Sequence, residues 1–284
     1  MKLLSFGEVL WDVYPNKKCL GGAPLNFAAH FSKLGGEAYI LSAIGNDEFK
    51  TETLKKLEAW GVCKDYLCIS DNYPTGVCNV TLNENAIPQY DLKQNVAYDH
   101  ISCDNIKADF DVLYFGSMAL RSDFNKNSVI TLLENKEFKE VFVDVNIRPP
   151  FYTKETVKFC LNNATIIKIS DEELSTINNC ISIKETDIEN NIKAIFRKFP
   201  QLRLIIITKG AKGSLCYDAL SDKFYNCKAK KVNVVSTVGA GDSFSAAFLF
   251  KYSGGENIDS CLEFASALSA YVCSNIDAVP ELYV

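Results

Sequence analysis

The sequence of 284 residues contains only two histidines, His30 and His100, and its eleven cysteines include no C-x-x-C pair. A zinc site needs several such ligands at short spacings, so we do not expect one. The cysteine count is odd and no secretory apolar stretch follows Met1, which argues against a disulfide framework. We therefore expect reduced thiols and a cytoplasmic protein.

An excess of basic charge is also missing. Lys and Arg number 30 against 35 Asp and Glu, which gives a formal net charge of −5, and the basic residues form no cluster. This argues against nucleic acid or an anionic membrane surface as the main partner. No apolar run is long enough to span a bilayer. Any anionic ligand must therefore be held by a local site.

Two common catalytic motifs are absent. The chain has no G-x-x-x-x-G-K-[ST] loop and no G-x-S-x-G turn, which excludes P-loop nucleotidases and the usual α/β-hydrolases. Hydrophobic residues make up 48% of the chain, enough to bury a large core. Because no internal repeat and no low-complexity linker occurs, we predict one domain over residues 1–284.

Strand-like and helix-like segments alternate along most of the chain, which predicts a parallel sheet with crossover helices. The predicted strands are short, mostly apolar runs at residues 2–9, 38–44, 112–115, 141–145, 166–170, 204–208 and 231–235. Helical spacing of apolar residues occurs at residues 25–34, 47–60 and 240–252. We therefore predict an α/β protein.

One region does not follow the alternation of predicted strands and helices. Residues 75–82 and 89–92 alternate on either side of the turn-like sequence NENAIP, which predicts a hairpin. Together with the extended residues 10–14, this hairpin could form a small separate sheet that covers a site. A surface hairpin without a function is the alternative.

The sequence VVSTVGAGDSFSAA, residues 234–247, joins a strand-like run to a helix-like run. Gly239 and Gly241 have no Cβ, so they let an anion approach the backbone closely. The first amides of a helix lack intrahelical partners, and the helix dipole adds positive charge there. We therefore predict a site for a phosphate or an oxyanion, a feature that serves both phosphoryl and acyl transfer.

Asp242 follows these glycines and has three interpretations. It could be a first-turn residue that complements the helix dipole. It could be a general base that accepts a proton from an alcohol during phosphoryl transfer. A G-x-G-x-x-G nucleotide fingerprint is the third option, but position 244 is Phe244 instead of glycine, which disfavours it.

Polar residues follow several predicted strands. These are Asp144, Asn146 and Arg148, then Ser170 and Glu173, then Thr208, Lys209 and Gly210. In an open parallel sheet such strand ends meet at one edge, where ligands bind. We expect them to form one cleft with residues 239–242. Asp12 stands among apolar residues and is either an outward-facing strand residue or an acceptor for sugar or alcohol hydroxyls.

Two motifs in the right order carry a family resemblance. The first comprises G-G-A-P-L-N at residues 21–26, Leu34-Gly35, and I-G-N-D-E-F at residues 44–49; the second is T-V-G-A-G-D-S-F at residues 237–244. Over nearly its whole length the chain resembles the PfkB family of carbohydrate kinases, and fructokinase-type members in particular. The resemblance implies a three-layer ribokinase-like fold, whose central, mostly parallel sheet is flanked by helices. It also implies a small β-sheet lid from about residues 10–20 and 73–98.

The resemblance implies roles for individual residues. Asp242 matches the catalytic base, and the matching anion hole is formed by Gly239, Ala240 and Gly241. Positions that match residues near the sugar are Asp12, Gly22, Asn26 and Arg148. Positions that match residues beside the nucleotide are Ser170, Thr208, Gly210, Gly213 and Ser266. Glu173 matches a glutamate that organises magnesium through water.

The activity implied is ATP-dependent phosphorylation of a primary hydroxyl of a sugar, with fructose as the preferred acceptor. Mg²⁺ would neutralise the phosphates, and closure of the lid would exclude water. In several members of the family, lids pair to form dimers, so a homodimer through the lid is expected.

Other functions stay open at this point. The acceptor could be another sugar, a sugar acid bound through Arg148, or a nucleoside stacked on Tyr73 or Tyr90. A non-catalytic binding or regulatory protein on the same scaffold is a further alternative. It is motivated by three departures from the family pattern: Ser170 replaces an asparagine, Ser236 replaces an aspartate, and Asp277 replaces a glycine. A fourth departure is Ser266, where members of the family commonly have asparagine.

The first prediction concerns potassium. In the family, the regions of Ser236 and Asp277 border a monovalent cation, and Ser236 has no carboxylate to offer it. We therefore expect only a small increase in activity when potassium replaces sodium in the assay buffer. A large activation by potassium would contradict this expectation.

Overall fold

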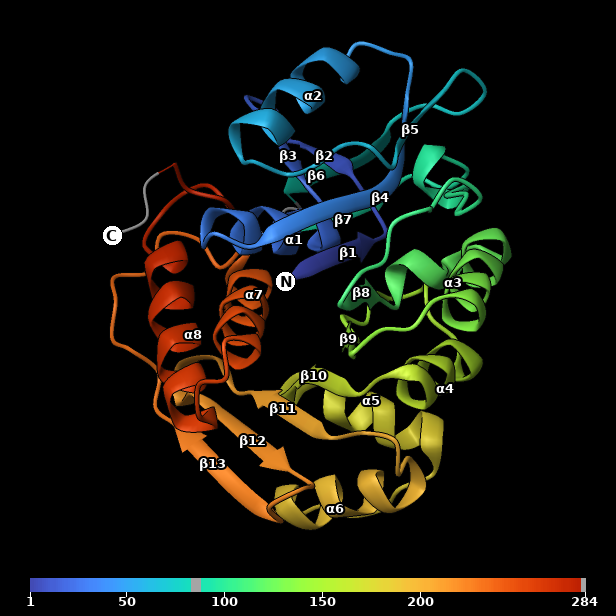
Figure 1. The fold of residues 1–284 in the computed structure, drawn as a ribbon. Helices are drawn as coiled ribbons and strands as arrows, with labels where there is room; N and C mark the ends of the chain where they lie inside the picture. Colours follow the sequence, from blue (N-terminus) through green and yellow to red (C-terminus); the bar gives the residue numbers. More distant parts are fainter. Residues whose placement is uncertain (83–87, 282–284) are drawn as a thin grey trace.

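The computed structural model describes residues 1–82 and 88–281 (Figure 1). A nine-stranded sheet runs through the molecule with helices on both faces, and a second, four-stranded sheet lies beside it. This confirms the predicted α/β fold with a large, mostly parallel sheet and a small separate sheet. Among the helices of the described residues, none has the length and apolar character needed to cross a membrane.

The large sheet has the strand order β13-β12-β11-β10-β9-β8-β1-β4-β5. Its strands are β1 (Lys2–Phe6), β4 (Glu37–Gly45), β5 (Leu67–Ser70), β8 (Val112–Gly116), β9 (Glu140–Asp144), β10 (Ile166–Ser170), β11 (Leu204–Thr208), β12 (Ser214–Asp218) and β13 (Lys223–Cys227). Every neighbouring pair from β5 to β11 is parallel, and β12 and β13 continue the sheet in antiparallel order. The parallel strands therefore end at a common edge.

Both faces of this sheet are buried, as a parallel sheet requires. In β8, Leu113 and Phe115 belong to one core, and Val112 and Tyr114 belong to the other. The first core receives side chains from α3 (Asp123–Asn135), α4 (Lys154–Asn163), α5 (Asp171–Ile181) and α6 (Ile188–Lys198). The second receives side chains from α1 (Ala23–Lys33), α2 (Lys50–Ala59), α7 (Ala240–Ser253) and α8 (Ile258–Cys273).

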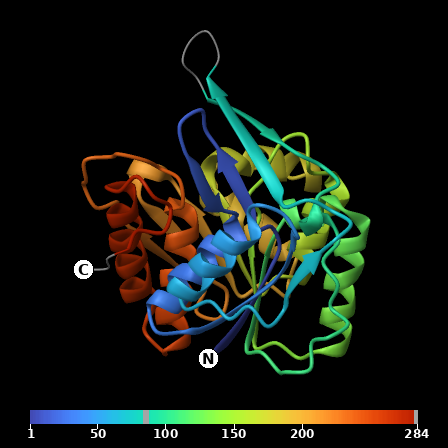
Figure 2. The same ribbon diagram turned by 90° about the horizontal axis from the view of Figure 1, so that it is seen from above.

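The small sheet has the order β3-β2-β6-β7. Its strands are β2 (Leu10–Val13), β3 (Lys18–Gly21), β6 (Gly76–Leu82) and β7 (Pro88–Leu92). Strands β6 and β7 pair in antiparallel fashion, and β2 joins them, as expected from the sequence. Figure 2 shows these strands projecting from the body of the molecule. Of the predicted NENAIP turn, residues 83–87 lie outside the described part of the chain.

One predicted strand is wrong. Residues 231–235 alternate as a strand would, but they form none in the structure, and the last strand is β13. Val234 and Val235 are 63% and 58% exposed. The amide of Val235 donates to the carbonyl of Cys273 in α8, at 2.8 Å, instead of pairing with a strand. A segment with period-two alternation forms a strand only where a neighbouring strand supplies its hydrogen-bond partners.

A buried ion pair fastens the chain where it returns from the small sheet. Arg121, at the end of the short helix η2 (Met118–Arg121), donates to both carboxylate oxygens of Asp99 at 2.7 and 2.9 Å. It also donates to the carbonyl of Lys93, just after β7, at 2.7 Å. The side chains of Arg121 and Asp99 are only 6% and 8% exposed. Removing either partner would leave a buried charge without compensation.

We expect Arg121→Met to lower the free energy of unfolding by about 3–5 kcal/mol, because Asp99 would stay buried without its cation. The matched control is Lys139→Met, because the side chain of Lys139 is 81% exposed in its pair with Asp111. Removing that exposed pair should change the stability by about 0–1 kcal/mol. Urea denaturation followed by circular dichroism measures both. Equal losses for the two variants would show that the buried pair does not fasten this segment.

Candidate active site

A cavity of about 1530 Å³ opens between the small sheet and the edge where the parallel strands end. Lys209, which was expected in this cleft, is not among the residues that line it, but the walls include every residue to which the family resemblance gives a role. These are Asp12, Gly22, Asn26, Arg148, Ser170, Glu173, Thr208, Gly210, Gly213, Gly239, Ala240, Gly241, Asp242 and Ser266. This volume exceeds the range of about 300–1,000 Å³ that is typical of ligand pockets, so the cavity has room for more than one small molecule.

The start of α7 forms an anion-binding turn on this wall. Gly239 precedes the helix with a φ of 78°, and a Cβ there would lie 2.6 Å from the carbonyl oxygen of Ala278. Only glycine fits this position. Among the described residues, the amides of Gly241 and Asp242 have no hydrogen-bond acceptor. Two amide groups and the helix dipole are therefore available to an anion.

Asp242 lies in the first turn of α7. The side-chain amide of Asn26 donates to its carboxylate at 2.8 Å. Burial raises the pKa of Asp242 to about 6, against the opposing effects of the Asn26 hydrogen bond and of Lys168 and Arg148. A carboxylate with this pKa is ionised at neutral pH, yet it accepts a proton more readily than an exposed aspartate does.

A buried ion pair lies beneath this turn and was not foreseen from the sequence. The ammonium of Lys168 on β10 donates to the two oxygens of Asp144 on β9 at 3.0 and 2.9 Å. A Cβ on Gly241 would lie 3.1 Å from that ammonium. Burial lowers the pKa of Lys168, but Asp144 and Glu173 outweigh it, so the pKa is raised and the cation is retained. The available signal was a lysine within the otherwise apolar run IIKIS.

Asp12 and Gly22 form the wall on the side of the small sheet. Burial raises the pKa of Asp12, while a hydrogen bond with Cys78 and the charge of Arg148 lower it. Gly22 has a φ of 114°, and a Cβ there would lie 2.2 Å from the carbonyl oxygen of Glu8. Arg148 is exposed on the opposite wall, within electrostatic range of Asp12 and Asp242.

Glu8 is a second wall residue that was missed, although it stands as a carboxylate in an apolar strand-like run. One of its oxygens accepts from the amide of Ala23 at the start of α1, at 3.2 Å. Its other oxygen is buried and has no hydrogen-bond partner within residues 1–82 and 88–281. Burial raises the pKa of Glu8 to about 7. The second oxygen is therefore a candidate partner for a ligand hydroxyl.

Ser170 and Glu173 form a capping box at the start of α5. One oxygen of Glu173 accepts from the amide of Ile147 at 2.5 Å, and the other accepts from the amide and the hydroxyl of Ser170, both at 2.8 Å. In the described part of the chain, no three His, Cys, Asp or Glu side chains group as a metal site. Both oxygens of Glu173 are thus engaged by backbone and hydroxyl donors of this wall.

The last part of the wall follows β11. Thr208 ends this strand, and the turn after it contains Gly210 and Gly213 with φ values of 51° and 97°. A Cβ on Gly213 would lie 2.0 Å from the carbonyl oxygen of Cys227, so the turn requires glycine. Ser266 on α8 faces the same cavity and is 8% exposed.

Ser236 and Asp277, two of the departures from the family pattern, do not line this cavity. Both border a second, smaller cavity of about 610 Å³. The hydroxyl of Ser236 accepts a hydrogen bond from the amide of Val238 at 3.2 Å, within its own turn. The position therefore offers a neutral oxygen in place of a carboxylate, and the weak response to potassium stays a prediction.

The family model described as pfkB family carbohydrate kinase matches residues 4–281. "Probable fructokinase-5" of Arabidopsis thaliana is 28% identical over 313 aligned residues, which cover 99% of this chain and 94% of that protein.

Two solved structures share the fold. The fructokinase from Vibrio cholerae O395 in its fructose-, ADP- and calcium-bound form has a TM-score of 0.85 and 22% identity, covering 99% of this chain and 95% of that chain. The aminoimidazole riboside kinase from Salmonella enterica, complexed with aminoimidazole riboside and an ATP analogue, has a TM-score of 0.83 and 21% identity, covering 99% and 96%.

The geometry predicts the ionisation of Asp242. Its pKa should be about 6, and Asn26→Leu should raise it further, because the amide that stabilises the carboxylate is lost. Carbon-13 NMR of labelled aspartate measures this pKa, with Asp242→Asn to assign the signal. Ser269→Ala is the control, since its hydroxyl contacts the carbonyl of Ala240 at 2.9 Å and not the carboxylate. A pKa near 4 in the wild type, or no change in Asn26→Leu, would contradict the assignment.

Proposed function

The chain belongs to the pfkB family of carbohydrate kinases, and on that premise we propose that it transfers the γ-phosphate of ATP to a primary hydroxyl of fructose. That it is an ATP-dependent sugar kinase follows from the family. The choice of fructose is supported by the name of the Arabidopsis relative and by the fructose bound in the Vibrio structure.

Asp242 is the proposed general base. It would accept the proton of the attacking hydroxyl while the hydroxyl oxygen forms its bond to the γ-phosphorus and ADP leaves. The observation that supports this role is a carboxylate with a pKa of about 6, beside two unpaired amides at a helix start. A first-turn residue that served only the helix dipole would not need burial or the hydrogen bond from Asn26.

Gly239, Ala240 and Gly241 are proposed to hold the transferring phosphate. Their turn offers unpaired amides, and the buried cation of Lys168 lies directly beneath it. These groups are fixed before the reaction begins. They would therefore stabilise the charge that develops on the phosphoryl oxygens without reorganising.

The sugar is proposed to lie between the small sheet and α1. Asp12 and Asn26 would accept and donate hydrogen bonds to its hydroxyls, and Gly22 would let it approach the backbone. Arg148, on the opposite wall, would contact the sugar or the transferring phosphate. The small sheet, as a lid, would exclude water from the closed site, and we propose that two such sheets pair in a homodimer.

The nucleotide is proposed to lie at the other end of the cavity. Thr208 would contact it from the end of β11, Gly210 and Gly213 from the turn that follows, Ser170 from the end of β10, and Ser266 from α8. Mg²⁺, held by phosphate oxygens and water with Glu173 as the outer partner, would supply charge neutralisation.

One assay tests this function. Purified protein is mixed with ATP, Mg²⁺ and a panel of acceptors comprising fructose, other sugars, a sugar acid and a nucleoside, and ADP formation is measured. We expect the highest kcat/KM with fructose. The riboside kinase among the structural neighbours makes a nucleoside the informative alternative in the panel.

Asp242→Asn should reduce kcat by about 10²–10⁴-fold, because the base is removed. Asp259→Asn is the matched control: Asp259 also lies in the first turn of a helix, α8, but outside the cavity. It should leave kcat unchanged. If no acceptor gives ADP above the background of Asp242→Asn, the proposed function fails.

A further inference from the structure

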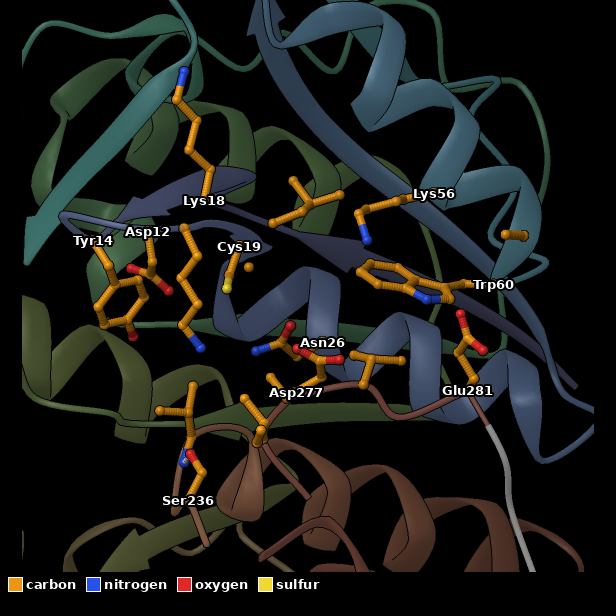
Figure 3. Close-up of a pocket in the computed structure, with 18 of the residues that line it drawn as sticks. Asp12, Tyr14, Lys18, Cys19, Asn26, Lys56, Trp60, Ser236, Asp277 and Glu281 are labelled. Atoms are coloured by element: carbon orange, nitrogen blue, oxygen red, sulfur yellow. Dashed lines mark hydrogen bonds between the residues drawn. The ribbon is translucent and has the colours of Figure 1, made fainter.

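The second cavity, of about 610 Å³, adjoins the strand pair β2–β3 (Figure 3). Its walls come from β2, β3, α1, α2, residues 235–238 and residues 276–281. Asp242 is not among the residues that line it. Asp12 and Asn26 line both cavities, so an occupant of the second cavity would lie against two residues of the proposed sugar site.

Two lysines of this cavity have no carboxylate partner among the described residues. The ammonium of Lys17 lies 5.0 Å from the centre of the Tyr14 ring, and that of Lys56 lies 5.7 Å from the centre of the Trp60 ring. Neither forms an ion pair in the described part of the chain, although exposed and half-buried lysines elsewhere do. Two cations are therefore available to a ligand.

The other two lysines of the cavity are already engaged. Lys18 pairs with Glu48 at 3.5 Å, and in Figure 3 its side chain points away from the centre of the cavity. Lys33 donates to the backbone carbonyl of Glu281 at 3.1 Å and so holds the C-terminal segment. Because both lysines already have partners within the protein, we do not assign them to the ligand.

Acceptor groups face the two available cations. Asp277 comes from the C-terminal segment and Asp12 from β2, and both line the cavity together with Lys17 and Lys56. Cys19 lies among these charges: burial raises its pKa, and Lys17, Asp277, Asp12 and Lys56 all act on it. The charges thus surround one volume, yet the lysines and carboxylates do not pair with one another.

Hydroxyl-binding groups complete the lining. The side-chain oxygen of Asn26 is buried and has no hydrogen-bond partner in the described residues. Carboxylates and amides of this kind bind sugar hydroxyls, and an indole such as that of Trp60 can cover the apolar face of a sugar ring. One cavity therefore combines cations for an anionic group with acceptors for hydroxyls.

We propose that the second cavity binds a sugar phosphate monoester, the chemical class of the product of a sugar kinase, with the phosphate on Lys17 and Lys56 and the hydroxyls on Asp12, Asn26 and Asp277. A phosphate monoester carries about two negative charges at neutral pH, which matches two ammonium groups. A nucleoside triphosphate carries more, and the carboxylates of this cavity would repel it.

Occupation of this cavity weakens binding of the acceptor sugar, because the sugar phosphate engages Asp12 and Asn26, which also line the catalytic cavity. This coupling rests on the proposed function, whereas the binding itself does not. By linkage, the acceptor sugar weakens binding of the sugar phosphate by the same factor. This coupling would slow the kinase when sugar phosphate, the class of compound that it produces, accumulates.

The test compares Lys56→Gln with Lys55→Gln. These neighbours on α2 carry the same charge, but only Lys56 lines the cavity. Fructose 6-phosphate, glucose 6-phosphate and inorganic phosphate are titrated into the intact protein by calorimetry. We expect a sugar-phosphate site that Lys56→Gln weakens at least tenfold and Lys55→Gln leaves unchanged. Inorganic phosphate should bind at least tenfold more weakly than either sugar phosphate.

Equal affinities in Lys56→Gln and Lys55→Gln would overturn the proposal, because binding would then be confined to the catalytic cavity. Equal affinity for inorganic phosphate and the sugar phosphates would also overturn it, because the hydroxyl contacts would be absent. In kinetics, fructose 6-phosphate should raise KM for the acceptor more in Lys55→Gln than in Lys56→Gln. If fructose is not the acceptor, these kinetics will show no reaction with it, whereas the calorimetric test of the second cavity is unaffected.

Discussion

The hydrogen bond from Asn26 to Asp242 joins two residues that lie 216 positions apart in the chain. It connects the first turn of α1 to the first turn of α7, two helices that pack together on one face of the sheet. Each helix follows a glycine with a positive φ, so each brings backbone amides to the same cavity. The geometry of the site therefore depends on how these two helices are held on the large sheet.

The charges around this bond have to be balanced, because Asp242, Asp144 and Glu8 are carboxylates in a buried region. Lys168 compensates Asp144 directly, and Arg148 acts from the exposed wall. The net charge of the chain is −5, so attraction of an anionic substrate has to come from these local cations and from the unpaired amides of α7. The second cavity likewise has its own local cations, because Lys17 and Lys56 line it and do not line the first.

Much of this arrangement could be predicted from the sequence. The parallel sheet followed from apolar runs alternating with helical spacing, and the meeting of polar residues at one edge followed from the parallel order. Residues 231–235 were predicted wrongly, because alternation cannot reveal whether a partner strand exists. Lys168 and Glu8 were missed for a related reason: a charged residue in an apolar strand has an ambiguous role until its neighbours in space are known. The separation of Ser236 and Asp277 into a second cavity likewise depends on how distant loops pack.

The most direct test of the role of Asp242 is the pH dependence of kcat/KM, compared with the pKa of Asp242 measured independently by NMR. Because kcat/KM reports ionisations of the free protein, its acid limb should coincide with that pKa, near pH 6. The rate should fall as the pH drops through this value, since the protonated carboxyl cannot accept the hydroxyl proton. A profile that stays flat through pH 6, or an acid limb well separated from the measured pKa, would contradict the assignment of Asp242 as the base.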